Sequence, residues 1–203
     1  IYAVAGLVVV PWILTWTTSP NVLAVRRAAP ARELVRCFLY GAAWGIGGLT
    51  WGLMIRYLGV GLGLAIGCGL CSATGTLIPP ILEGRAAELV GTPAANLSLL
   101  GVVLSLAGIV LVGMAGMSKE QELPEEEKKK AVAEYNFRKG LLVAIFSGVM
   151  SSAMSFGLQG GRTIEQLARE TEPITATAWA GMPVLVVVLL GGFVINALWC
   201  LYL

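Results

Sequence analysis

The sequence predicts an all-α membrane protein with about six transmembrane helices, on three observations. Hydrophobic residues make up 57% of the 203 residues and charged residues only 13%, against roughly a quarter in an average soluble domain. The charges gather in short segments between long uncharged ones, as loops do between membrane spans. The uncharged runs are continuously apolar, whereas the strands of a membrane barrel would alternate polar and apolar residues over about ten positions. A lipid bilayer is therefore the expected surrounding of the chain.

Six segments meet or approach the length of about 20 apolar residues that a spanning helix needs. They are residues 1–17, 34–55, 58–82, 94–117, 140–160 and 180–203. Pro11 interrupts the first segment, and the pair Pro79 and Pro80 marks the end of the third. The chain begins and ends inside apolar runs, so we expect a fragment of a longer protein.

The connections between these segments differ in character. About three residues beyond Arg56 join the second and third segments, which predicts a tight antiparallel hairpin. Residues 118–139 are the most polar stretch, with three glutamates followed by three lysines, and residues 161–179 are amphipathic. Seven Lys and Arg residues fall on each side of the predicted membrane. The positive-inside rule therefore does not decide the orientation.

Composition also excludes several classes of function. The chain contains neither histidine nor aspartate, which removes common zinc ligands and most general bases. We therefore expect no enzyme, no metal site and no cofactor. The net charge is only +2 and no basic face with interleaved aromatic residues is present, so nucleic acid is not an expected partner. Cys68 and Cys71 form a C-x-x-C pair, which we interpret as helix packing, with a redox site as the alternative.

Glycines form stripes along two of the predicted helices. In the second segment they recur on one helical face, at Gly41, Gly45, Gly48 and Gly52. The third segment repeats the pattern with a residue every four positions, at Gly59, Gly63, Gly67, Cys71 and Gly75. Small residues let helix backbones approach closely inside a membrane. We interpret the stripes as packing surfaces, and a role of deformable packing in conformational change remains open.

Two tryptophans in the second segment are candidates to line a cavity. Trp44 and Trp51 are seven residues apart, hence near one face, and Thr50 precedes Trp51. Aromatic rings stack on the apolar faces of sugars, and both tryptophans lie too deep for the aromatic belt at the membrane surface. Contact with lipid is the alternative. Arg56, at the end of the segment, is expected to act as a positional anchor at the interface.

A polar face on the fifth segment gives the clearest functional signal. Ser147, Ser151, Ser155 and Gln159 recur every four residues on an otherwise apolar helix. Such a face turns away from lipid, toward neighbouring helices or a watery cavity. No ionisable side chain lies in the middle of a span, so a proton-carrying group cannot be assigned. We predict a transporter of a small polar solute with Trp44, Thr50, Trp51, Ser151, Ser155 and Gln159 lining its cavity. A structural or assembly subunit without transport activity is the alternative.

Several motifs carry a resemblance to a known family. The run from Tyr40 to Pro80 reads YGAAWGIGGLTWGLMIRYLGVGLGLAIGCGLCSATGTLIPP. Its pieces G-A-x-W-G-I-G, G-L-x-x-R-Y-L-G and G-T-L-x-x-P, in that order, resemble the L-rhamnose–proton symporter family of the drug/metabolite transporter superfamily. The stretch 137–141 and the serine-rich helix after it are similar to the family's sixth helix. The family carries a more polar pair, asparagine and tyrosine, where this chain has Gly48 and Trp51.

The resemblance implies a ten-helix transporter of the inner membrane, built from two inverted halves of five helices. Residues 1–117 would hold four helices of the first half, without its first helix. Residues 118–139 would be the loop between the halves, and residues 140–203 the first two helices of the second half. It also implies a sugar such as L-rhamnose as solute and a proton as coupling ion, moved by alternating access. A drug/metabolite-type transporter of another metabolite remains an alternative.

Overall fold

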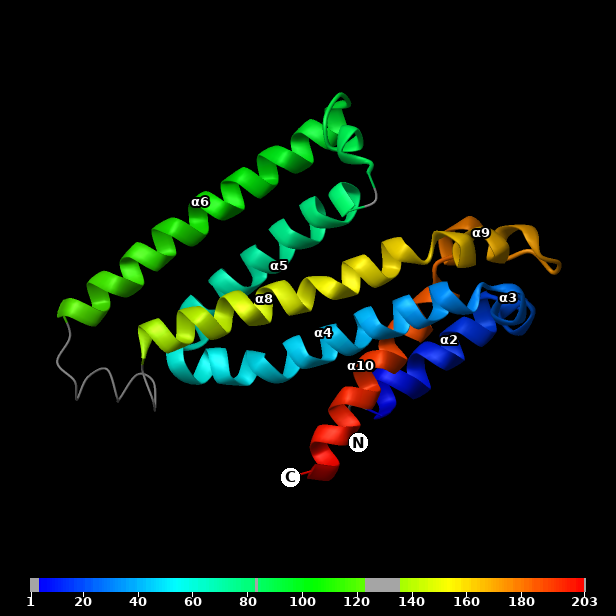
Figure 1. Cartoon of the computed structure of the whole chain (residues 1–203), viewed down its shortest axis with the longest axis horizontal. Helices are drawn as coiled ribbons and strands as arrows, with labels where there is room; N and C mark the ends of the chain where they lie inside the picture. The colour runs from blue at the N-terminus through cyan, green and yellow to red at the C-terminus, as the bar shows by residue number, and fades with distance from the viewer. Residues whose placement is uncertain (1–3, 83, 123–135, 203) are drawn as a thin grey trace. The chain divides into compact units, whose positions relative to one another are not determined.

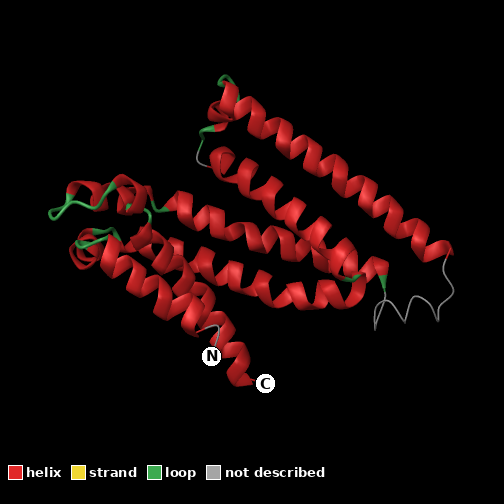
Figure 2. Ribbon diagram, turned by 180° about the vertical axis from the view of Figure 1, so that it is seen from behind, coloured by secondary structure: helices red, strands yellow, loops and turns green. Residues whose placement is uncertain are grey.

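The computed structural model describes residues 4–82, 84–122 and 136–202, and within these ranges it contains helices and no strand (Figures 1 and 2). Five of the described helices are long and apolar enough to cross a membrane, and a bent pair counted as one span makes six. The five are α4 (Ala31–Leu58), α5 (Val60–Leu82), α6 (Pro93–Glu122), α8 (Phe137–Gly160) and α10 (Met182–Tyr202). The predicted all-α fold with about six spans is confirmed.

The chain forms two compact units. The first consists of Ile1–Ile46 with Ala153–Leu203, and the second of Gly47–Ser152. Because the boundaries fall inside α4 and α8, each of these helices contributes one part to each unit. The inverted halves expected at 1–117 and 140–203 stay a prediction. Most of the charged stretch 118–139, with its glutamates and lysines, lies outside the described residues.

A bent helix pair opens the first unit. A π-helical turn (Ala5–Val9) leads into α2 (Val10–Thr18), and α3 (Val22–Ala28) follows after a bend of 99°. Pro11 lies in the first turn of α2 and has no N–H to donate to the preceding turn, which explains the widened turn before it. The predicted interruption at Pro11 is thus observed. The short helix α3 lies between the first two predicted segments, where the sequence predicted a loop.

Asn21 ties this bend to the amphipathic helix α9 (Arg162–Glu170). Its side chain is only 2% exposed. The Asn21 Nδ2 donates to the carbonyl oxygens of Ala168 at 2.8 Å and Thr171 at 2.7 Å, and the Thr175 hydroxyl donates to Asn21 Oδ1 at 2.7 Å. A buried amide must satisfy its donors and acceptor within the protein. This network therefore fixes the connection before α3 against the segment that follows α9.

Asn21→Ala is expected to destabilise the full-length protein by about 2 to 3 kcal/mol. The substitution leaves the buried Thr175 hydroxyl and the partly buried Thr171 carbonyl without their partner, and an orphaned buried group costs roughly 1–3 kcal/mol. Thermal unfolding of the detergent-solubilised protein measures the effect. Asn96→Ala is the matched control, because Asn96 is exposed in the first turn of α6. Equal unfolding temperatures for the two variants would contradict this role of Asn21.

Glycine brings α4 and α10 into backbone contact in the first unit. A Cβ at Gly41 would lie 1.9 Å from the Val188 carbonyl oxygen, and one at Gly191 would lie 2.1 Å from the Phe38 carbonyl oxygen. At Gly45 a Cβ would come within 2.9 Å of the Gly192 carbonyl oxygen. The packing interpretation is therefore confirmed for the first two glycines of the predicted stripe. A Cβ at Gly48 or Gly52 meets no described atom within 4 Å. The prediction that the four glycines form one continuous contact surface is therefore wrong.

The second unit is built on the hairpin of α4 and α5. Only Gly59 separates the two helices, and its φ of 80° lies in the left-handed region that favours glycine. The hairpin is confirmed, with Gly59 as its connector and not as a member of the helical stripe. Gly63 and Gly67 face Met54, which belongs to a core cluster of buried side chains. The members of this cluster are Met54, Leu58, Ile66, Phe137 and Ala144.

The helix α5 continues through both prolines and ends at Leu82, the predicted limit of the third segment. A proline pair in a last turn removes only two backbone donors, and the helix ends soon afterwards. The next long helix, α6, packs on α5 in this unit, where a Cβ at Gly69 would lie 2.6 Å from Ile109 Cδ1. Only 6% of the most apolar part of α6 is buried, so its outward apolar side chains suit a lipid or protein neighbour.

Candidate functional site

The predicted site residues lie on α4 and α8, distributed over the two units. Thr50, Trp51 and Ser151 belong to the second unit, together with the exposed Arg56 in the last turn of α4. Trp44, Ser155 and Gln159 belong to the first unit. We therefore describe two groups of side chains, one within each unit.

In the second unit, α4 and α8 cross at a group of polar contacts, the α4–α8 crossing, formed by Gly47, Thr50, Trp51, Ser147 and Ser151. The Trp51 indole N–H donates to the Ser151 hydroxyl at 2.7 Å. The Gly47 carbonyl oxygen accepts from the Ser147 hydroxyl at 3.0 Å and from the Thr50 hydroxyl at 2.8 Å. The Thr50 bond lies within α4, whereas the bonds of Ser147 and Ser151 join α4 to α8 and, inside a membrane, replace those that water would offer.

Gly47 makes this close crossing possible. A Cβ at this position would lie 2.7 Å from the Ser151 backbone nitrogen and 2.8 Å from its hydroxyl oxygen. Any side chain larger than hydrogen would thus push α8 away and break the bonds around it. Gly47 lies outside the predicted glycine stripe and was not singled out as a site residue. The sequence does contain one indication of Gly47, the adjacent pair Gly47 and Gly48. Only Gly48 fits the predicted stripe, so Gly47 points to a second helix contact.

The Trp51 ring is held from a second side by α5. A Cβ at Gly67 would lie 3.3 Å from Trp51 Cη2, so the absent side chain leaves room for the indole. Trp51 remains half-buried, whereas Ser151 is buried with 7% exposed. The ring is therefore fixed at its edge and by its nitrogen while part of its surface stays accessible. A fixed, partly open aromatic surface is suited to stacking on the apolar face of a small solute.

In the first unit, Trp44 has a different neighbour. Its ring covers Gly192 of α10, where a Cβ would come within 2.6 Å of Trp44 Cε3. The two tryptophans that the sequence placed near one face are thus held by different helices, although both are half-buried. Whether Trp44 lines a cavity stays a prediction.

Ser155 and Gln159 continue the polar face of α8 in the first unit. Both are half-buried, and neither side chain makes a hydrogen bond within the described part of the chain. Next to them, the rings of Tyr40 and Phe156 meet edge to face with centroids 5.8 Å apart. Ser147 and Ser151 are already bonded to protein groups. The polar face of α8 therefore divides into a first part engaged in helix contacts and a second part with unused hydrogen-bonding capacity.

Other candidate chemistry finds little support among the described residues. They contain no group of three His, Cys, Asp or Glu side chains arranged to hold a metal ion. The thiols of Cys68 and Cys71 are free, and Cys68 is exposed on α5. In α10, Asn196 Nδ2 donates to the Gly192 carbonyl oxygen at 2.8 Å, one turn earlier in its own helix. The polar groups of α4 and α8 thus remain the principal candidate site.

Comparison with known proteins relates the whole chain to transporters. The L-rhamnose-proton symporter of Cronobacter sakazakii is 34% identical over 204 residues, covering 98% of this chain and 56% of that protein. The one from Yersinia pestis bv. Antiqua is 33% identical over 202 residues, covering 98% and 57%. The chain thus spans little more than half the length of these relatives. No solved structure matches it. The family model for the L-rhamnose-proton symport protein (RhaT) matches residues 1–203, and the chain belongs to that family.

Proposed function

We propose that this chain is the part of a proton-coupled sugar transporter that carries a portion of its solute pathway, with L-rhamnose or a related sugar as solute. The family is one of symporters and not of enzymes. Its membership and the apolar helices make the chain a multi-pass protein of the inner membrane. The bond between Trp51 and Ser151 is the observation that carries the site proposal, since it fixes a partly open indole ring against the polar face of α8.

The chemistry of a sugar fits the side chains that the two helices offer. A sugar ring presents apolar C–H faces and a rim of hydroxyl groups. In the first unit, half-buried Trp44 offers aromatic surface, and Ser155 and Gln159 offer side-chain donors and acceptors that no described protein group uses. In the second unit, half-buried Trp51 offers aromatic surface. Pockets for small ligands combine these two elements. Ser151 acts in this proposal by holding Trp51 in place, and Gly47 acts by letting α8 approach α4. The Thr50 hydroxyl bonds within its own helix, and the place of Thr50 in the solute pathway stays a prediction.

Proton coupling is proposed from the family alone. The chain has no aspartate or histidine, and the glutamates among the described residues lie in loops, in short helices or near the ends of long helices. Alternating access would have to move helices that meet at glycine-mediated crossings, and Gly47 provides one between α4 and α8. Transport of another metabolite is the second candidate, favoured by Gly48 and Trp51, where the family pattern has more polar residues.

Gln159→Ala in the full-length protein is expected to raise the KM for L-rhamnose uptake roughly three- to tenfold, because a neutral hydrogen bond contributes about 0.5–1.5 kcal/mol. Uptake of radiolabelled L-rhamnose into proteoliposomes measures this. Gln166→Ala is the matched control, since Gln166 is exposed on α9 and, among the described residues, its side chain bonds to Glu170 of the same helix. An unchanged KM in Gln159→Ala would remove Gln159 from the proposed site. A rise for another sugar alone would favour the second candidate.

A further inference from the structure

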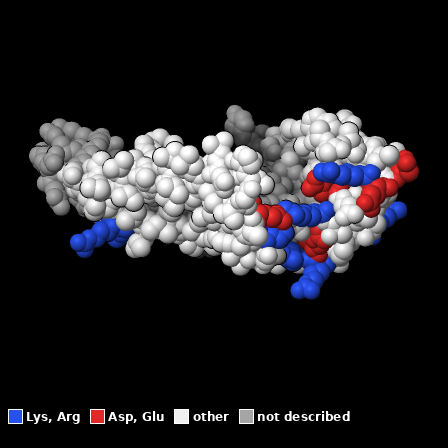
Figure 3. Space-filling view, turned by 90° about the horizontal axis from the view of Figure 1, so that it is seen from above, with Lys and Arg blue, Asp and Glu red and all other residues white. Residues whose placement is uncertain are grey.

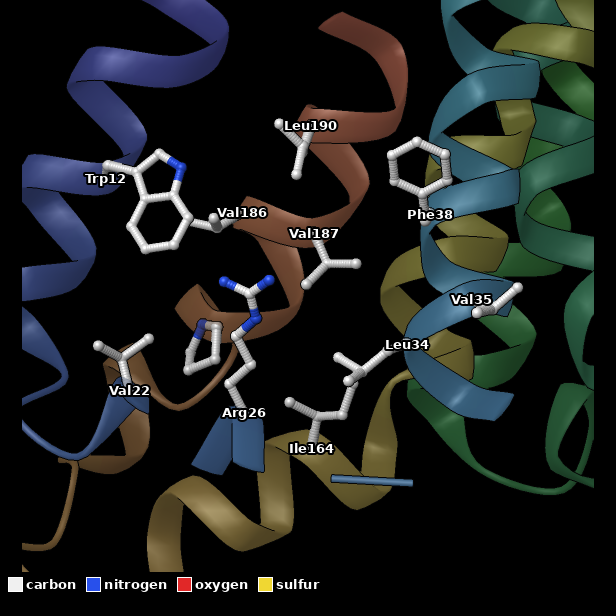
Figure 4. A pocket seen from close by; sticks show the side chains of 11 residues that line it. Trp12, Val22, Arg26, Leu34, Val35, Phe38, Ile164, Val186, Val187 and Leu190 are labelled. Atoms are coloured by element: carbon white, nitrogen blue, oxygen red, sulfur yellow. The ribbon is translucent and has the colours of Figure 1, made fainter. Parts of the chain in front are cut away.

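The first unit contains an apolar pocket with a single charged lining residue. Its volume is about 240 Å³. Helices α2, α3, α4, α9 and α10 supply the lining, which includes Trp12, Val22, Phe38, Ile164, Val186 and Val187. Arg26 of α3 is the charged member. Figure 4 shows the Arg26 side chain rising from α3, with its guanidinium group among the apolar side chains.

The Arg26 guanidinium has no hydrogen-bond or ion-pair partner among the described residues. The acids of the neighbouring helices α4 and α9 are engaged with other groups. Glu33 Oε1 accepts from the Thr163 backbone N–H at 3.0 Å, Glu165 pairs with Arg169, and Glu170 accepts from Gln166. A cation beside apolar side chains is stabilised by an anion that can reach it. Arg26 is exposed, so an anion from outside the protein has access.

The surroundings of the pocket are those of a membrane surface. It lies beside the short helices α3 and α9, near the residues where α4 and α10 begin, and its lining extends along α4 to Phe38 and along α10 to Leu190. Most of the charged side chains visible in Figure 3 gather at this end, around α3 and α9. The exposed arginines there include Arg26, Arg27, Arg32 and Arg162. Basic pockets between helices at this depth recognise the headgroups of anionic lipids.

We propose that this pocket binds one anionic phospholipid of the membrane, with its phosphate on the Arg26 guanidinium and part of an acyl chain among the apolar side chains. The guanidinium fork matches two phosphate oxygens, and an anionic lipid offers them without the cationic group that a zwitterionic headgroup carries beside its phosphate. Pockets for drug-sized ligands measure roughly 300–1,000 Å³. This pocket is smaller and suits a segment of an acyl chain. A sugar fits it poorly, because its lining offers almost no hydrogen-bonding groups. The lining of this pocket includes none of the residues proposed to contact the solute.

Trp12 provides a local probe of this site, because bromine atoms on an acyl chain quench a tryptophan that they touch. The delipidated full-length protein in detergent is titrated with brominated phosphatidylglycerol or brominated phosphatidylcholine. The signal of Trp12 is the difference between the wild type and Trp12→Phe. We expect phosphatidylglycerol to reach half-maximal quenching of this signal at a roughly five- to tenfold lower concentration than phosphatidylcholine. One arginine contact of about 1 kcal/mol or slightly more has this effect.

Variants of the arginines separate the pocket from general surface charge. Arg26→Gln is expected to abolish the preference for phosphatidylglycerol, and Arg26→Lys to retain part of it. Arg27→Gln should retain it fully, because Arg27 is exposed on the same helix and does not line the pocket. Equal quenching by the two lipids, an unchanged preference in Arg26→Gln, or no quenching of Trp12 by either lipid would overturn the proposal. Displacement by free inorganic phosphate as effective as that by unbrominated phosphatidylglycerol would also overturn it.

Discussion

Gly41→Ala is expected to separate α4 from α10 and to lower the stability of the full-length protein by at least 1–3 kcal/mol, the usual cost of overpacking. The added Cβ would lie 1.9 Å from the Val188 carbonyl oxygen and 2.9 Å from its Cα. Both are backbone atoms, so no rotamer change can relieve the contact and the helix itself must move. Thermal unfolding in detergent, together with the yield of protein in the membrane, measures the effect.

Gly52→Ala is the matched control for this prediction. Gly52 belongs to the same helix and the same predicted stripe, but it is exposed, and a Cβ there meets no described atom within 4 Å. Its substitution should leave the unfolding temperature nearly unchanged or raise it slightly, since alanine favours helix by up to about 1 kcal/mol over glycine. The close contact of α4 with α10 would be refuted if Gly41→Ala and Gly52→Ala behaved alike.

Trp51→Phe is expected to reduce L-rhamnose uptake by roughly tenfold while the protein stays folded. The phenyl ring keeps aromatic surface but loses the N–H that donates to Ser151 at 2.7 Å, so the ring is no longer oriented. A lost bond with an unpaired buried partner costs about 1–3 kcal/mol, and every 1.4 kcal/mol is tenfold in affinity. Trp199→Phe is the control, because Trp199 is exposed near the end of α10.

A double-mutant cycle with Ser151→Ala tests whether the bond itself is responsible. Ser151→Ala leaves the indole N–H without its acceptor, and the double variant should transport about as well as either single one. Effects that multiply in the double variant would show that the two residues act independently. That outcome would contradict a role of Ser151 in holding Trp51.

The spans themselves could be predicted from the sequence because their signal is local. Continuous apolar runs require helices in a membrane, and the predicted limits of 34–55 and 140–160 fall within α4 and α8. The bend after α2 was less predictable, since it depends on buried Asn21 meeting the carbonyls of Ala168 and Thr171 nearly 150 residues later. No periodicity in either segment indicates such a partner.

The candidate site was predictable as a set of residue types and much less as a set of contacts. A spacing of seven placed Trp44 and Trp51 near one face, but their partners are Gly192 of α10 and Ser151 of α8. Likewise, the serine stripe did not distinguish buried Ser147 and Ser151 from half-buried Ser155 and Gln159. Gly47 was missed because its role depends on which helix packs against it. The sequence of α4 does not indicate that α8 approaches at this position.

Uptake of L-rhamnose by the full-length protein, purified and reconstituted into proteoliposomes, tests the proposed function most directly. An imposed pH gradient, acidic outside, is expected to drive accumulation of the sugar above its external concentration. A protonophore should abolish this accumulation, and Trp51→Phe should reduce its rate while Trp199→Phe does not. Uptake that fails for L-rhamnose and related sugars, or that proceeds equally without the pH gradient, would contradict a proton-coupled sugar transporter.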